Sequence, residues 1–313
     1  MLARVANNLF WMGRYLERTE HIARFMNVNY FSSLDAPSEV SQSRNFVLKS
    51  ILFLVSGEIA EDKNVTDEKK VLYDVGLNPD NDFSILNCFK CARENASGSR
   101  DLLSTELFES INSLHHYITN YPSEHFVANG LDEFTSAVSR GIILLRGKII
   151  ETLIHDEAFA IISLGMNLER ASQVIRIINT KYVDAKSSKT EFHNSFTNSF
   201  EWTTLLKSIQ SFDMMKRYYK KAPTSADTLD FLILNPSCPR SVMSSLNSAA
   251  KYIKILTKNE KRDSSSFLIN KIRCEYSYTS IDEIEGRFAD FIEEIIDKIT
   301  EISIRIEEEF FSY

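Results

Sequence analysis

Glycine and proline are scarce in this chain, which has 9 glycines and 6 prolines among its 313 residues. Average usage would supply roughly 22 glycines and roughly 16 prolines. These two residues punctuate turns and hairpins, so their scarcity predicts few tight turns and long regular elements. The shortage therefore favours helices.

Cysteines and long apolar runs are also lacking. The four cysteines are too few for a disulfide framework in a chain of this length. No stretch reaches about 18 apolar residues, so we predict no membrane span. Polar residues interrupt the N-terminal segment, which does not read as a signal peptide. The expected compartment is the cytoplasm.

Positive charge is not in excess, because the formal net charge is −7. A dedicated nucleic-acid binder carries a basic face, so this class is disfavoured and no nucleic acid is expected as a partner. The chain is 43% hydrophobic and 25% charged, which is ordinary for a globular protein with a sizeable core. Its length suits two domains or one large one.

Apolar residues recur at helical spacing along most of the chain. In residues 2–30 they occupy one face and spread onto others, which is typical of a central helix packed on several sides. Further helices are expected at 43–60, 84–97, 104–119, 131–154, 157–183, 199–220, 226–234, 240–257 and 281–310. Polar breaks are expected at 61–70, 184–190 and 258–266, and a short extended piece at 274–279. The fold class is therefore all-α.

Three sequence anchors recur in the same order in the two halves of the chain. The first pairs Met12-Gly13 and Leu16-Glu17-Arg18 with Leu164-Gly165 and Leu168-Glu169-Arg170, 152 residues later. The others pair Leu48-Lys49-Ser50-Ile51 with Leu206-Lys207-Ser208-Ile209, and Asn78-Pro79 with Asn235-Pro236. This pattern predicts a duplication. We expect a multi-helix bundle of two related halves, 1–156 and 157–313, packed as one unit with equivalent motifs facing each other.

The first Leu-Glu-Arg motif lies within a charged arc. At about 100° per residue, Arg14, Glu17, His21 and Arg24 fall within roughly 80° of the helix surface, and Arg18 sits about 40° beyond. This arc interrupts an otherwise apolar helix. Its cations outnumber its acids.

The second copy of the motif has fewer charged residues. It keeps Glu169, Arg170 and Arg176, but Met166 stands in place of the first arginine and Gln173 in place of the histidine. One interpretation is a seam of ion pairs that fixes how the halves dock, since buried charges must be paired. The other is an anion or carboxylate pocket, because a guanidinium binds carboxylate or phosphate at two points.

Other clusters are weaker. Cys88 and Cys91 have metal-like spacing, but no second close pair completes a four-ligand zinc site. Glu17, Glu20 and His21 resemble part of a di-iron set, which the second copy does not repeat. We therefore predict no metal and no cofactor. The candidate ligand- or partner-binding residues are Arg14, Glu17, Arg18, His21, Arg24, Arg93, Glu94, Glu169, Arg170, Arg176 and Arg240.

Several segments resemble the alpha-E domain family, a group of bacterial all-helical proteins named for a Glu-Arg motif. The resemblance is carried by 1–20, by Ala92-Arg93-Glu94-Asn95-Ala96, by 164–171 and by 231–242, and so runs nearly end to end. It departs from the family pattern at Met166 and Ser172, which weakens the second copy.

The resemblance implies partners: a circularly permuted ATP-grasp protein, a transglutaminase-like protein, or both. It suggests a part in making or modifying peptides or similar amides. Three hypotheses follow: an accessory protein that binds the ligase partner or a peptide-like carboxylate, an enzyme with Glu17 or Glu169 as general base, or a scaffold with the motifs as a packing seam. The sequence itself assigns no catalytic residue.

Overall fold

The computed structural model describes residues 1–34, 44–58, 67–187, 199–257 and 261–312. Every regular element in these ranges is helical, and they contain no strand. The all-α prediction is confirmed. None of the described helices combines the length and the apolarity needed to cross a bilayer.

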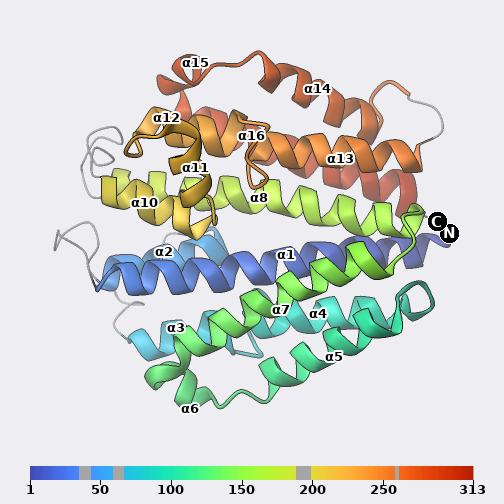
Figure 1. Ribbon diagram of the computed structural model, residues 1–313, viewed down its shortest axis with the longest axis horizontal. Coiled ribbons are helices and arrows are strands. Elements are labelled where there is room, and N and C mark those ends of the chain that lie inside the picture. The colour runs from blue at the N-terminus through green and yellow to red at the C-terminus, as the bar shows by residue number, and fades with distance from the viewer. Residues whose placement is uncertain (35–43, 59–66, 188–198, 258–260, 313) are drawn as a thin grey trace.

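Two long helices form the centre of the bundle. Helices α1 (Ala3–Ser32) and α8 (Glu157–Ser187) lie side by side and run in the same direction (Figure 1). Helix α1 is buried on most sides, as its all-round apolar pattern predicts. Among its fully buried side chains are Leu9, Phe10, Met12, Leu16 and Phe25.

Each central helix has its own flanking set. Helix α1 packs on α4 (Ile85–Ser97) and α7 (Leu131–Thr152), and α5 (Thr105–Thr119) lies outside these two. In the same way, α8 packs on α13 (Val242–Leu256) and α16 (Phe288–Ile306), with α14 (Ser265–Ser277) outside. The two sets occupy opposite sides of the central pair (Figure 1).

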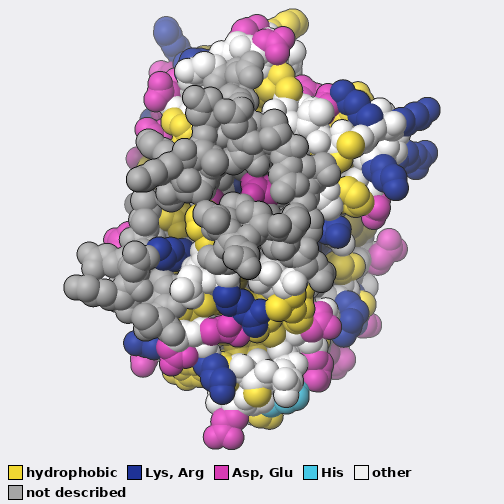
Figure 2. All heavy atoms as spheres, turned by 90° about the vertical axis from the view of Figure 1, so that its left-hand side faces the viewer, with side chains coloured by type: hydrophobic (Ala, Val, Ile, Leu, Met, Phe, Trp, Pro, Cys, Tyr) yellow, Lys and Arg dark blue, Asp and Glu magenta, His cyan; other side chains and the backbone are white. Residues whose placement is uncertain are grey.

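Shorter elements complete the bundle. Helices α2 (Arg44–Ser56) and α10 (Ser199–Ser208) each contact both central helices. The others are α3 (Glu68–Gly76), η2 (Arg100–Leu102), α6 (Ser123–His125), η3 (Phe126–Gly130), α11 (Phe212–Tyr219), α12 (Ser225–Leu229), η4 (Asp230–Leu234), α15 (Ile281–Glu285) and η5 (Glu307–Phe311). At the end of the bundle where α1 and α8 finish, Figure 2 shows charges of both signs, with Lys and Arg gathered along one edge.

Two glycines allow the central helices to touch. A Cβ added at Gly13 would lie 2.4 Å from the carbonyl oxygen of Ile162, and one at Gly165 would lie 2.3 Å from that of Phe10. The two contacts are reciprocal, since each glycine of one helix meets the residue that precedes the other glycine by three. Only glycine fits such a close backbone approach. These contacts agree with a two-fold arrangement of the halves, and the duplication itself stays a prediction.

Several predicted boundaries are wrong. Helix α8 continues to Ser187, through the first part of the break expected at 184–190, and 188–190 lie outside the described residues. The extended piece expected at 274–279 is largely helix, because α14 runs to Ser277. The helix expected at 199–220 is two helices, and Gln210 between them has a left-handed φ of 60°.

Two further departures concern short helices. Helix α3 begins inside the charged run expected to be a loop, because the Asp67 carboxylate caps it by accepting from the amides of Lys69 and Lys70. The last predicted helix, 281–310, is interrupted at Gly286, so that α15 and α16 are separate.

Candidate functional site

The two Glu-Arg motifs pair with each other across the α1–α8 interface. Arg170 donates to both carboxylate oxygens of Glu17, from Nε at 2.7 Å and Nη2 at 3.1 Å. Arg18 donates to both oxygens of Glu169, from Nε at 2.7 Å and Nη2 at 3.2 Å. Each glutamate therefore holds the arginine of the other motif in a two-point pair, the strongest geometry such groups have.

The helix contact explains why the motifs meet. Gly13 lies one turn before Glu17, and Gly165 lies one turn before Glu169. The backbones are in contact at the glycines. The side chains of the next turn consequently reach across the interface, and both carboxylates are sealed, with 0–1% of each side chain exposed.

Glu169 is the centre of a smaller cluster. Besides Arg18, it accepts from Arg14 Nε at 2.8 Å and from the amide of Gln173 at 2.8 Å. Burial raises the pKa of a carboxyl group, but the charges of Arg18 and Arg14 outweigh it, so the pKa of Glu169 lies well below its ordinary value. Glu169 is therefore ionised at neutral pH.

Glu17 shares a larger cluster with Glu20. Arg146, from α7, places Nε 3.1 Å from Glu17 and donates from Nη2 to Glu20 at 2.6 Å. Arg240 lies just before α13, with Nη1 3.4 Å from an oxygen of each glutamate. Arg24, one turn beyond Glu20 on α1, pairs with it as well.

Cations exceed acids in this interface. Its three carboxylates are fully sealed, whereas the arginine side chains each keep between 9% and 16% of their surface exposed. The arginines are Arg14, Arg18, Arg24, Arg146, Arg170 and Arg240. Six arginines thus surround three carboxylates, and each arginine side chain keeps a small exposed fraction.

The excess of positive charge is greatest around Glu20. Burial, with repulsion from Arg146 and Arg170, lowers the pKa of Arg240 to about 9, although Glu17 opposes the shift. Burial and repulsion from Arg240 and Arg146 also lower the pKa of Arg24. Within the described chain, Nη1 of Arg24 is buried without a hydrogen-bond partner. Positive charge here is therefore incompletely compensated.

His21 is fully buried beside these groups. Burial is the main reason that its pKa falls to about 4, so the ring is neutral at pH 7. Its Nδ1 lies 2.9 Å from the carbonyl oxygen of Glu17. A carbonyl oxygen only accepts, so Nδ1 carries the proton and Nε2 is left with a lone pair. Nε2 is buried and has no partner in the described residues.

The donor set does not favour a metal ion. Glu17, Glu20 and His21 place potential ligand atoms within 4.8 Å of one another. Their carboxylates are already bound by Arg146 and Arg240. A metal cation would join an excess of positive charge, whereas an anion would reduce it.

Cys88 and Cys91 lie on α4 and form no disulfide. Cys88 is buried, which raises its pKa to about 12 and keeps it an unreactive thiol.

Three predicted candidates lie outside the paired clusters. Arg93 donates from Nε to Asn112 of α5 at 3.0 Å, and Glu94 is exposed on the same helix. Arg176 is also exposed on α8. Arg240, by contrast, does reach a carboxylate, which explains an arginine at a helix start where the dipole disfavours it.

Sequence reasoning missed two members of the site. Arg146 follows the buried Leu145 and lies one turn after Ile142, so it borders the apolar stripe of α7. A lone arginine at the edge of such a stripe is a usable signal for a buried partner. Glu20 was considered only as a metal ligand, although it lies one turn before Arg24.

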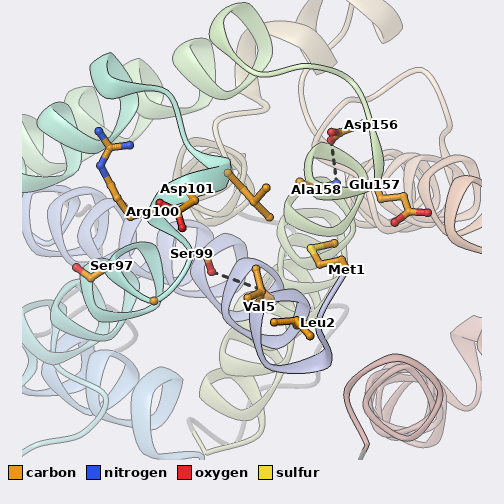
Figure 3. Close-up of a pocket in the computed structure, with 12 residues that line it drawn as sticks. Met1, Leu2, Val5, Ser97, Ser99, Arg100, Asp101, Asp156, Glu157 and Ala158 are labelled. Carbon is orange, nitrogen blue, oxygen red and sulfur yellow. Dashed lines mark hydrogen bonds between the residues drawn. The ribbon is translucent and has the colours of Figure 1, made fainter.

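A cavity of about 550 Å³ opens at the beginnings of α1 and α8, where η2 and the end of α4 also meet (Figure 3). Asp156 and Glu157 line it together with the apolar Leu2, and Asp156 accepts from the amide of Ala158. Arg100 points away, its Nη1 donating to the carbonyl of Leu103. None of the paired Glu-Arg residues lines this cavity.

These features define an all-helical protein organised around two reciprocally paired Glu-Arg motifs. The chain belongs to the Alpha-E family, described as a predicted alpha-helical domain with a conserved ER motif, and the match covers residues 1–311. The resemblance seen in the sequence is thereby confirmed. No curated protein and no solved structure matches the chain.

Proposed function

We propose that this protein is a cytoplasmic accessory component of an amide-forming system, and that it binds a peptide-like carboxylate at the arginines around Glu17 and Glu20. One observation carries the proposal: six arginines, each with between 9% and 16% of its side chain exposed, surround three sealed carboxylates. A further carboxylate would balance part of the excess and could be held at two points.

The ligand's place is best supported at Arg24, Arg146 and Arg240. These three come from α1, α7 and the segment before α13, and they converge on one carboxylate, that of Glu20. Arg24 also has a buried Nη1 without a partner in the described chain. A carboxylate that reaches this buried group would supply the acceptor that it lacks, and the pairs between α1 and α8 would stay in place.

The enzymatic alternative is less well supported. A general base needs reach to its substrate and a pKa near the working pH. Glu17 and Glu169 are sealed, and arginines hold the pKa of each far below its ordinary value. The scaffold alternative is compatible with binding, because the glutamates form the seam while the arginine side chains remain partly exposed.

Calorimetric titration tests the ligand. An N-acetylated dipeptide should bind, and the same dipeptide with an amidated C-terminus should not. Arg240→Gln should weaken binding at least 10-fold, while Arg217→Gln, which removes an exposed arginine of α11, should leave it unchanged. Absence of saturable binding, or equal binding of the amide, refutes the carboxylate site.

A second titration tests the partner. We expect a circularly permuted ATP-grasp protein or a transglutaminase-like protein, the partners implied by the family resemblance, to bind the purified chain. If neither binds, with or without the dipeptide, the accessory role is wrong even where the ligand binds.

A further inference from the structure

A second cavity, of about 490 Å³, lies between α13 and α14 and contains none of the paired Glu-Arg residues. Polar side chains at helical spacing on the two helices form its walls. The lining residues are Asn247, Ala250, Lys251, Lys254, Thr257, Ser266, Asn270 and Arg273. We call this cavity the α13–α14 groove.

All charged groups that line the α13–α14 groove are cations. Lys251 and Lys254 are three residues apart, so they share one face of α13, and Arg273 faces them from α14. No acidic side chain among the described residues lines the groove. Among the described residues, neither lysine forms an ion pair and no acid lines the groove beside the three cations.

Arg273 is held in place by neutral groups. Its Nε donates to Asn247 Oδ1 at 2.7 Å, and its Nη1 donates to Asn270 Oδ1 at 2.8 Å. The guanidinium is therefore held in position by these two amide oxygens, and no carboxylate among these partners neutralises its charge. Because the Asn247 oxygen accepts from Arg273, the side-chain NH2 of Asn247 is oriented as a donor for a ligand.

The other end of the groove adds hydroxyl groups. Thr257 Oγ1 is buried there, with no hydrogen-bond partner in the described part of the chain. Ser266 belongs to the first turn of α14, where the helix dipole favours an anion. Glu309 accepts from the amide of Ser265 at 2.9 Å nearby, but it does not line the groove.

We propose that the α13–α14 groove binds a phosphorylated small molecule. A phosphate group carries nearly two negative charges and only acceptor oxygens, which matches three cations and an otherwise donor-rich wall. A single carboxylate would compensate only one of the three cations. The cavity falls within the range of about 300–1,000 Å³ typical of small-molecule sites, so it has room for an organic group beside the phosphate.

Calorimetry on the full chain tests this site with metal-free pyrophosphate and adenosine monophosphate as probes, and citrate as a carboxylate comparison. The Lys251→Gln/Lys254→Gln double variant should bind the phosphate probes at least 10-fold more weakly. Both lysines are exposed on α13, so this variant is expected to fold normally. Arg273→Gln should show a similar loss.

Arg93→Gln is the matched control, because it removes an arginine–asparagine contact between α4 and α5 in the other half. It should bind the probes normally, as should Arg240→Gln, which alters the carboxylate site instead. Three results would overturn the proposal: no saturable binding of either phosphate probe, binding of citrate with equal affinity, or unchanged binding by the lysine double variant.

Discussion

Removing the charge of Glu169 tests the paired motifs most directly. Glu169→Gln keeps the shape of the side chain but leaves Arg14 and Arg18 facing no carboxylate, across contacts of 2.7–2.8 Å. Breaking a buried ion pair by removing one partner costs about 3–5 kcal/mol. The two arginine side chains keep 12% and 16% of their surface exposed, so water relieves part of the loss. We therefore expect the lower end, about 3 kcal/mol.

Urea unfolding followed by circular dichroism measures this loss. Glu275→Gln is the control, because the Lys298–Glu275 pair has a similar 2.7 Å contact but leaves 27% and 41% of its side chains exposed. That change should cost less than about 1 kcal/mol. If Glu169→Gln costs no more than the control, the motif is not a buried seam and the reasoning fails.

The Glu169 cluster also predicts that removing all of its charges together costs less stability than removing one. Replacing Glu169, Arg14 and Arg18 together by methionine removes the charges and fills a similar volume. Such replacements of buried ion networks are often neutral or stabilising. The triple variant should therefore unfold at a higher urea concentration than Glu169→Gln, although it carries more substitutions. A triple variant less stable than the single one would mean that the seam contributes more than charge pairing.

Three further changes have defined outcomes. His21 has a folded pKa of about 4 against 6.5 when exposed, so stability falls as the pH drops through this range, by about 2 kcal/mol at pH 5. His21→Gln, which copies Gln173 of the other motif, should abolish that fall in urea titrations at pH 7 and pH 5. Asp184 behaves oppositely. Burial raises its pKa from 3.8 to about 6, so protonation favours the folded state and stability falls as the pH rises from 3.8 through about 6. Asp184→Asn should raise stability by about 3 kcal/mol at pH 7 and by less than about 1 kcal/mol at pH 4. Gly165→Ala should lower the melting temperature by forcing α1 and α8 apart, whereas Gly147→Ala, with no atom within 4 Å of the new Cβ, should raise stability by about 0.5–1 kcal/mol.

The sequence carried most of the architecture because the central helices are long and strongly periodic. A pattern such as Leu9, Met12 and Leu16 survives any detail of packing, so α1 was predictable nearly to its ends. Short elements were not predictable in this way. Helix α3 depends on one cap, Asp67, and the break before α11 depends on one left-handed residue, Gln210.

Within the site, only the pairing of the Glu-Arg motifs was predictable from the sequence. Glu17, Arg18 and their second copies follow from local spacing, and their reciprocal pairing requires only that the equivalent helices touch. Arg146 is different, because its partners are more than a hundred residues away in the sequence. Its role depends on which face α7 turns toward α1. Helical periodicity does not specify that orientation closely enough to place one side chain.

The inequality of the two motifs explains why the proposed anion site lies on the side of Glu17 and Glu20. Arg14 of α1 completes the shell of Glu169, but the corresponding residue of α8 is Met166, which brings no charge to Glu17. Arg146 and Arg240 supply that charge from other segments.

Because these two arginines also serve Glu20 and adjoin Arg24, positive charge exceeds negative charge most on this side of the interface. The carboxylates are sealed while the arginine side chains are partly exposed, so the proposed ligand would compensate the excess without opening the seam. In the proposed function, structural and binding roles are therefore divided within the same ion pairs: the glutamates fix the helices, and the arginines would bind the ligand.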